Sequence, residues 1–143
     1  MDPMSILTFG YGSCTGVYIV LINALRAAGI PARLAGTSAW NDNPDNGNHS
    51  WIEFFRSDHK WHIHIMESLP ASGGDGISPT NLWDPCQWWF CKPDKVRGTT
   101  TFSAAKLVWM TSQQHFPMAW DPNNRMVPGE DRTKFMQELC SKC

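Results

Sequence analysis

The segment 11–33 constrains the fold most, because it places a cysteine at the start of an apolar helical pattern. Two glycines precede Cys14 and permit a sharp turn into a helix. Apolar residues then recur at three- and four-residue spacing as far as Ala28, which predicts a helix buried on most sides. Gly29 and Pro31 would end this helix.

Cys14 is therefore expected at a helix N-terminus, where N–H groups and the helix dipole favour the thiolate. A small buried hydrophobe is the alternative role for such a cysteine. His49 favours the first interpretation, since it opens the strand pattern of residues 50–55. A strand beside the helix would bring imidazole and thiol together, as cysteine nucleophile chemistry requires.

Alternating and aromatic residues predict a sheet of about five antiparallel strands against the Cys14 helix, which gives an α+β fold. The first ten residues are expected to be extended, and two polar or glycine-rich loops are expected at 38–48 and 69–80. A short helix is expected over 129–140, with acidic residues in its first turn. The expected strands cover residues 32–36, 50–55, 60–67, 99–103, 106–111 and 115–120.

Three motifs occur in order along the first half of the chain: Tyr11-Gly12-Ser13-Cys14, then Gly29-Ile30-Pro31-Ala32-Arg33, then Asn48-His49-Ser50-Trp51-Ile52-Glu53. Together they resemble the core of the transglutaminase-like superfamily. The resemblance implies a papain-like α+β core with Cys14 as nucleophile and His49 as its base. The backbone N–H of Cys14 is the expected oxyanion donor.

The third catalytic residue departs from the family pattern, in which an Asp follows the Trp of the third strand. Here Trp61 is followed by His62-Ile63-His64-Ile65-Met66-Glu67. Glu67 is our candidate for orienting His49, because a carboxylate that accepts the second imidazole N–H fixes the tautomer. A solvated strand-end carboxylate is the other interpretation of Glu67, and Asp84 is the alternative third residue.

The implied reaction is acyl transfer on a peptide or glutamine amide through a thioester, with a peptide or protein substrate and no cofactor. Small members of the superfamily are more often hydrolytic, which favours a protease or amidase over a transferase. Trp40, Trp88 and Trp89 are candidate substrate-binding residues, although a core role suits each of them too. The rival function is a catalytically inactive binding module, with Trp88, Trp89 and Trp120 forming a peptide or carbohydrate surface.

Four cysteines besides Cys14 occur as two close pairs, which could form two disulfides or hold one zinc ion. The pairs are Cys86 with Cys91 and Cys140 with Cys143. We favour disulfides, because a pair that ends at the last residue is poorly placed to close a metal site. Disulfides would indicate an extracytoplasmic or secreted protein, whereas zinc would suit a reducing compartment.

The remaining expectations come from length and charge. A chain of 143 residues predicts a single domain over 1–143, and the resemblance implies structure upstream of the helix that is lacking here. The net charge of -1 argues against nucleic acid. The longest apolar run, 17–22, is too short for a membrane span. His59, His62 and His64 lack a third ligand at supporting spacing, so we expect no metal.

Overall fold

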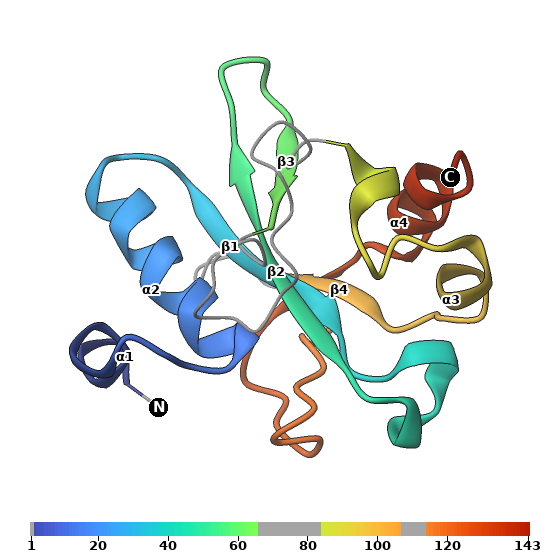
Figure 1. The fold of residues 1–143 in the computed structure, drawn as a ribbon, viewed down its shortest axis with the longest axis horizontal. Coiled ribbons are helices and arrows are strands. Elements are labelled where there is room, and N and C mark those ends of the chain that lie inside the picture. Colours follow the sequence, from blue (N-terminus) through green and yellow to red (C-terminus); the bar gives the residue numbers. More distant parts are fainter. Residues whose placement is uncertain (1, 66–83, 107–113) are drawn as a thin grey trace. The chain divides into compact units, whose positions relative to one another are not determined.

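The computed structural model of this chain describes residues 2–65, 84–106 and 114–143 (Figure 1). The chain divides into two compact units, the first of Met1–Leu34 and Ser50–Trp83, the second of Ala35–His49 and Asp84–Cys143. The strands follow the order β3-β2-β1-β4-β5, and β1 and β2 each run through both units. Helices with an antiparallel sheet confirm the α+β class. The papain-like arrangement and the single domain stay predictions.

The first unit begins with a helix where we expected an extended segment. This helix, α1 (Pro3–Phe9), starts at Asp2, whose carboxylate accepts hydrogen bonds from the N–H groups of Met4 and Ser5. The prediction was wrong because it overlooked an Asp cap followed by Pro at the first helical position, a strong start signal. Ile6 of α1 packs where a Cβ on Gly16 would lie 2.7 Å from its Cδ1 atom, so this glycine permits α1 to approach the next helix.

The next helix, α2 (Cys14–Ala27), begins at the predicted cysteine. Ser13 caps it by accepting a hydrogen bond from the N–H of Gly16. Gly29 follows the helix with φ of 77°, a conformation that glycine adopts without strain. The expected burial on most sides was wrong, because only one face, with Tyr18 and Ile22, is buried and the C-terminal alanines are exposed.

The predicted hairpin is confirmed in the first unit. Strand β2 (His49–Phe55) pairs antiparallel with β3 (Trp61–His64), from Ile52 opposite His64 to Phe55 opposite Trp61. Strand β1 (Ala32–Thr37) also forms at its predicted place, and the N–H of Phe55 donates to the carbonyl of Pro31 just before it. Trp51, Ile52, Ile63 and Ile65 form the buried core of this region.

The second unit departs further from expectation. Strand β4 (Phe102–Ala105) pairs with β1 on one side and with β5 (Gly129–Asp131) on the other. We wrongly expected Gly129 in the tail helix. The strand requires a glycine at this position, because a Cβ would lie 2.5 Å from the His115 backbone. The tail helix, α4 (Thr133–Cys140), starts after this strand.

Other expectations for the second unit were wrong or fall outside the described residues. Residues 115–120 form two isolated bridges, His115 with Pro128 and Met118 with Asp121, in place of a strand. The expected loop 69–80 and most of the strand 106–111 lie outside the described residues. The additional short helices are η1 (Trp40–Asp42), η2 (Pro44–Asn46), η5 (Pro85–Gln87) and α3 (Pro93–Arg97).

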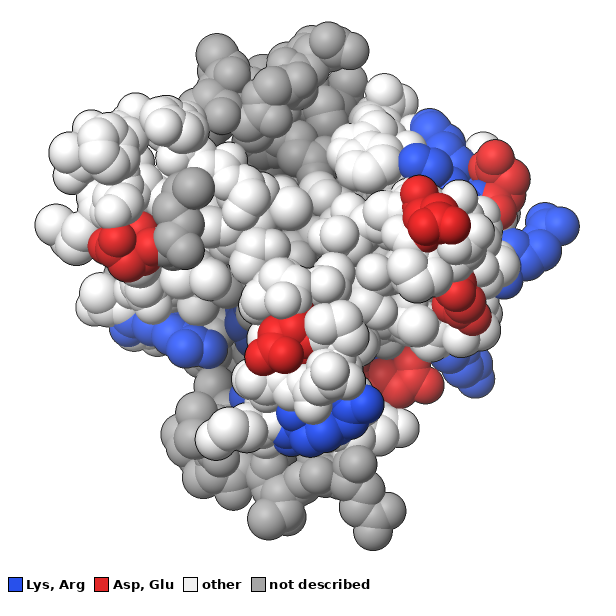
Figure 2. Space-filling model, turned by 90° about the horizontal axis from the view of Figure 1, so that it is seen from below, with Lys and Arg blue, Asp and Glu red and all other residues white. Residues whose placement is uncertain are grey.

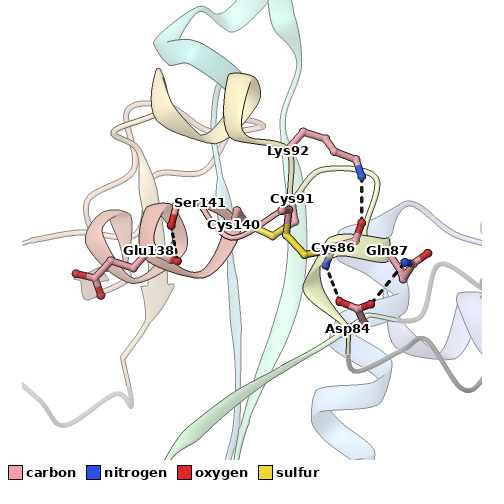
Figure 3. Close-up of a disulfide and its surroundings, with 9 residues drawn as sticks. Asp84, Cys86, Gln87, Cys91, Lys92, Glu138, Cys140 and Ser141 are labelled. Atoms are coloured by element: carbon pink, nitrogen blue, oxygen red, sulfur yellow. Dashed lines mark hydrogen bonds between the residues drawn. A yellow bond between two sulfur atoms is a disulfide. The ribbon is translucent and has the colours of Figure 1, made fainter.

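Two disulfides link η5 and the residues after it to the end of α4 (Figure 3). Cys86 joins Cys143 and Cys91 joins Cys140, with Cα atoms 5.0 and 5.1 Å apart. The disulfide alternative is therefore confirmed over zinc. Each bond joins a cysteine of the first close pair, Cys86 and Cys91, to a cysteine of the second, Cys140 and Cys143. Lys92 adds a hydrogen bond to the carbonyl of Cys86.

Charged side chains of both signs are mixed on the face seen in Figure 2. The second unit contains ion pairs between Arg132 and Glu130 at 3.7 Å and between Lys134 and Glu138 at 3.8 Å. Across the described ranges, no single helix has the length and apolar composition of a membrane span, and α1 with α2 reaches them only as a pair bent by 104°.

Candidate functional site

Cys14 occupies the first position of α2, at the N-terminal end that the sequence predicted. Its side chain is partly buried and takes part in neither disulfide. The Sγ atom lies 4.0 Å from the hydroxyl oxygen of Thr15. A thiol in this place meets the positive end of the dipole of a 14-residue helix, which stabilises its ionised form.

A hydrogen bond between two hydroxyl groups connects the start of α2 to strand β2. The Oγ1 atom of Thr15 lies 3.2 Å from the Oγ atom of buried Ser50. These residues directly follow Cys14 and His49 in the chain, and sequence reasoning passed over both. The available signal was a hydroxyl residue immediately after each member of the expected pair.

The first unit also contains a buried ion pair. Arg33 of β1 and Glu53 of β2 are 3% and 0% exposed, and the guanidinium carbon of Arg33 also lies 4.0 Å from the ring centroid of Trp61. A buried charge needs such partners to offset its lost hydration. This pair connects the strands that carry the second and third motifs, and sequence reasoning missed it.

His49 lies at the start of β2 in the second unit, with 5% of its surface exposed. Its ring contacts two aromatic rings, those of Trp89 at 4.9 Å and Phe90 at 5.1 Å between centroids. Trp40 contacts the same two rings at 5.9 and 6.2 Å. An aromatic cluster therefore surrounds the imidazole on at least two sides.

The three tryptophans named as candidate substrate-binding residues differ in burial. Trp40 and Trp88 are buried, whereas Trp89 is 44% exposed. Lys95 of α3 places its ammonium 4.4 Å from the Trp89 ring centroid, a cation–π contact. Trp89 thus combines a solvent-exposed ring with a direct contact to His49, while Trp40 and Trp88 pack in the core of the second unit.

The proposed catalytic residues fall in different places. Cys14 belongs to the first unit and His49 to the second. Glu67 lies outside the described residues. The alternative, Asp84, caps η5, where its carboxylate accepts hydrogen bonds from the N–H of Cys86 at 3.0 Å and from the Gln87 amide at 3.5 Å (Figure 3). The triad stays a prediction.

The histidines of the hairpin are engaged within it. His62 hydrogen-bonds the Asp58 carboxylate at 2.7 Å, and this contact lowers the pKa of Asp58 below its ordinary value. Burial lowers the pKa of His64, which lies against Phe54. No group of three His, Cys, Asp or Glu side chains suited to a metal ion occurs within the described ranges.

Comparison with known proteins supports the resemblance seen in the sequence. The model of the transglutaminase-like superfamily matches residues 1–64, which include α1, α2 and strands β1 to β3. The predicted resemblance is thereby confirmed over this part of the chain, which includes Cys14 and His49. No curated protein and no solved structure matches the chain.

Proposed function

We propose that this chain, transglutaminase-like over residues 1–64, is a cysteine enzyme that transfers the acyl group of an amide. His49 takes the proton of the Cys14 thiol, and the thiolate attacks the amide carbonyl. The tetrahedral intermediate, stabilised by the backbone N–H of Cys14, collapses to a thioester as the amine leaves with a proton from His49. Water then releases the acid, which makes the enzyme a protease or amidase.

The hydrogen bond between Thr15 and Ser50 carries this proposal. It joins Thr15, the residue after Cys14, to Ser50, the residue after His49 in the chain, and so supports the pairing of thiol and imidazole that we propose. The helix N-terminus at Cys14 adds the electrostatic condition for a reactive thiolate. A cysteine retained only for packing would need neither feature.

Glu67 remains our choice for the residue that orients the His49 imidazole. The contacts of Asp84 favour this choice, because its carboxylate already serves as the cap of η5. Trp89 is the best supported of the substrate-binding candidates, since its exposed ring contacts His49. A peptide or protein substrate laid along this ring would present its amide near His49.

A second function has some support from exposed aromatic surface in the second unit. Trp89 and Trp120 are 44% and 55% exposed, and exposed tryptophans are common in peptide and carbohydrate sites. Under this alternative the chain binds its ligand without chemistry. The two disulfides suit either function and support our proposal that the protein works in an oxidising, extracytoplasmic compartment.

The pH dependence of iodoacetamide labelling at Cys14 tests the proposal. We expect fast labelling below the ordinary thiol pKa of about 8.5, slowed in a His49→Ala variant. His59→Asn is the matched control, because His59 is exposed and Asn tolerates its φ of 58°. Labelling that follows an ordinary thiol titration in all three proteins would favour the binding module.

A further inference from the structure

We infer that the Cys91–Cys140 disulfide positions the imidazole of His49 through the two rings that precede it, Trp89 and Phe90. The disulfide and Phe90 act as positioning groups, since neither is assigned a contact with substrate. Trp89 is also a substrate-binding candidate, so its positioning role is tested by the His49 resonances and by Cys14 labelling, which involve no substrate. The effect on Cys14 reactivity rests on the proposed function, whereas the placement of His49 does not. All of these groups except Cys14 belong to the second unit.

The contacts run from the disulfide to the imidazole without a gap. Cys91 is bonded to Cys140, both are fully buried, and the N–H of Cys91 donates to the carbonyl of Trp88. Phe90, the residue before Cys91, is 0% exposed and lies 5.1 Å from the His49 ring. The disulfide therefore restrains the backbone next to Phe90, whose ring packs directly on the imidazole.

Trp89 also contacts neighbours other than His49. Its ring lies 5.7 Å from that of Phe90, and Lys95 of α3 places its ammonium over the same indole. Trp40 completes the cluster with an edge contact at 5.9 Å. Because the ring is fixed on several sides, it can restrict the orientation of His49 even though part of its surface is exposed.

Catalytic bases require this kind of support, because a productive geometry must be kept within about 0.5 Å and 10–20°. The N-terminal part of β2 follows an exposed segment, residues 41–48, which hydrogen bonds from Asn41 to Thr99 and from Thr100 to Asp42 hold in place. A covalent crosslink next to the packing rings adds a restraint on the His49 side chain itself. In the other disulfide, Cys86–Cys143, Cys86 lies four residues from Phe90 along the chain, whereas Cys91 is adjacent to Phe90.

The two disulfides provide a matched comparison. Cys91→Ser/Cys140→Ser and Cys86→Ser/Cys143→Ser each remove one bond, and the bonds close similar sequence separations of 49 and 57 residues. Similar separations mean similar entropic effects on the unfolded chain. A general loss of stability should therefore be shared, while an effect on His49 should appear in the first variant alone.

The primary measurement is the NMR chemical shift of the His49 ring protons in the full chain. Because aromatic rings lie 4.9 and 5.1 Å from the imidazole, we expect these resonances to be displaced from the random-coil position in the wild type. We expect a marked change towards the random-coil position in Cys91→Ser/Cys140→Ser and little change in the other pair. Cys14 labelling should slow by about tenfold in the first variant only.

A further pair of variants keeps the inference testable if the first variant does not fold. Trp89→Ala removes a 44% exposed ring, and Trp89→Phe restores an aromatic ring. We expect the alanine to reproduce the changes in shift and labelling and the phenylalanine to restore most of both. Unchanged His49 resonances in Trp89→Ala, or equal changes in both disulfide variants, would overturn the inference. Slow labelling already in the wild type would instead count against the proposed function.

Discussion

Arg33 donates two hydrogen bonds to the same carboxylate oxygen of Glu53, from Nε at 2.8 Å and from Nη2 at 2.6 Å. Both side chains are buried, so the pair is screened little by solvent. Arg33 ends the Gly-Ile-Pro-Ala-Arg motif, and Glu53 stands four residues after His49. Two of the three motifs that suggested the family are thus joined by one ion pair.

Removing one member of this pair should strongly destabilise the protein. Arg33→Met leaves the Glu53 carboxylate buried without its cation, and we expect the free energy of unfolding to fall by about 3–5 kcal/mol. Urea denaturation at neutral pH measures this loss. The double variant Arg33→Met/Glu53→Leu should recover part of it, because no buried charge remains.

The exposed pair Lys134 and Glu138 provides the control for that experiment. Their side chains are 91% and 68% exposed, so Lys134→Met should change the free energy of unfolding by no more than about 0.5 kcal/mol. Equal losses at Arg33 and Lys134 would show that burial of the first pair has no energetic consequence.

Thr15 and Ser50 should be energetically coupled. In a double-mutant cycle of Thr15→Val and Ser50→Ala, we expect a coupling free energy of about 1 kcal/mol from urea denaturation, the usual net value of one hydrogen bond. Both single variants should also slow iodoacetamide labelling of Cys14, because the segment carrying the thiol loses its connection to β2. Strictly additive effects on stability would mean that the two hydroxyls do not interact in solution.

The sequence predicted the features that depend on local patterns. The α2 boundaries follow from glycines on either side of an apolar run, and the β2–β3 hairpin follows from alternation about a polar turn. Cys14 and His49 were recognisable because residue type and motif context coincide. The helix α1 was missed although Asp2 and Pro3 signalled it locally.

Contacts between distant segments were beyond the sequence. Nothing local pairs Cys91 with Cys140, or places Phe90 against His49, because these contacts depend on chain reversals through regions of weak pattern. Strand β5 has only three residues, Gly129–Asp131, too few for alternation to register. Its acidic residues therefore resembled the first turn of the helix that follows.

His64 should make stability depend on pH below neutrality. Burial lowers the pKa of this imidazole from 6.5 in the folded chain, so the unfolded chain binds the proton first. As pH falls below about 6.5, the free energy of unfolding should decrease by up to about 1.4 kcal/mol per pH unit, until the folded pKa is passed. Above about pH 6.5 the contribution of His64 to the free energy of unfolding is fully present and constant.

Urea denaturation between pH 5 and pH 8 measures this dependence. The neutral variant His64→Gln should show a shallower slope below about pH 6.5, whereas His59→Asn, at an exposed site, should keep the wild-type slope. The same slope in wild type and His64→Gln would assign the pH dependence to other groups.

The two disulfides should each contribute substantially to stability. Cys86–Cys143 and Cys91–Cys140 close loops with sequence separations of 57 and 49 residues, so removing either bond should lower the free energy of unfolding by about 4 kcal/mol through the greater entropy of the unfolded chain. Thermal denaturation of the two Cys→Ser double variants measures the effect. Cys14→Ser, which touches neither bond, should shift the melting temperature far less. If reduction with a phosphine left the melting temperature of the wild type unchanged, the second unit would not depend on its crosslinks.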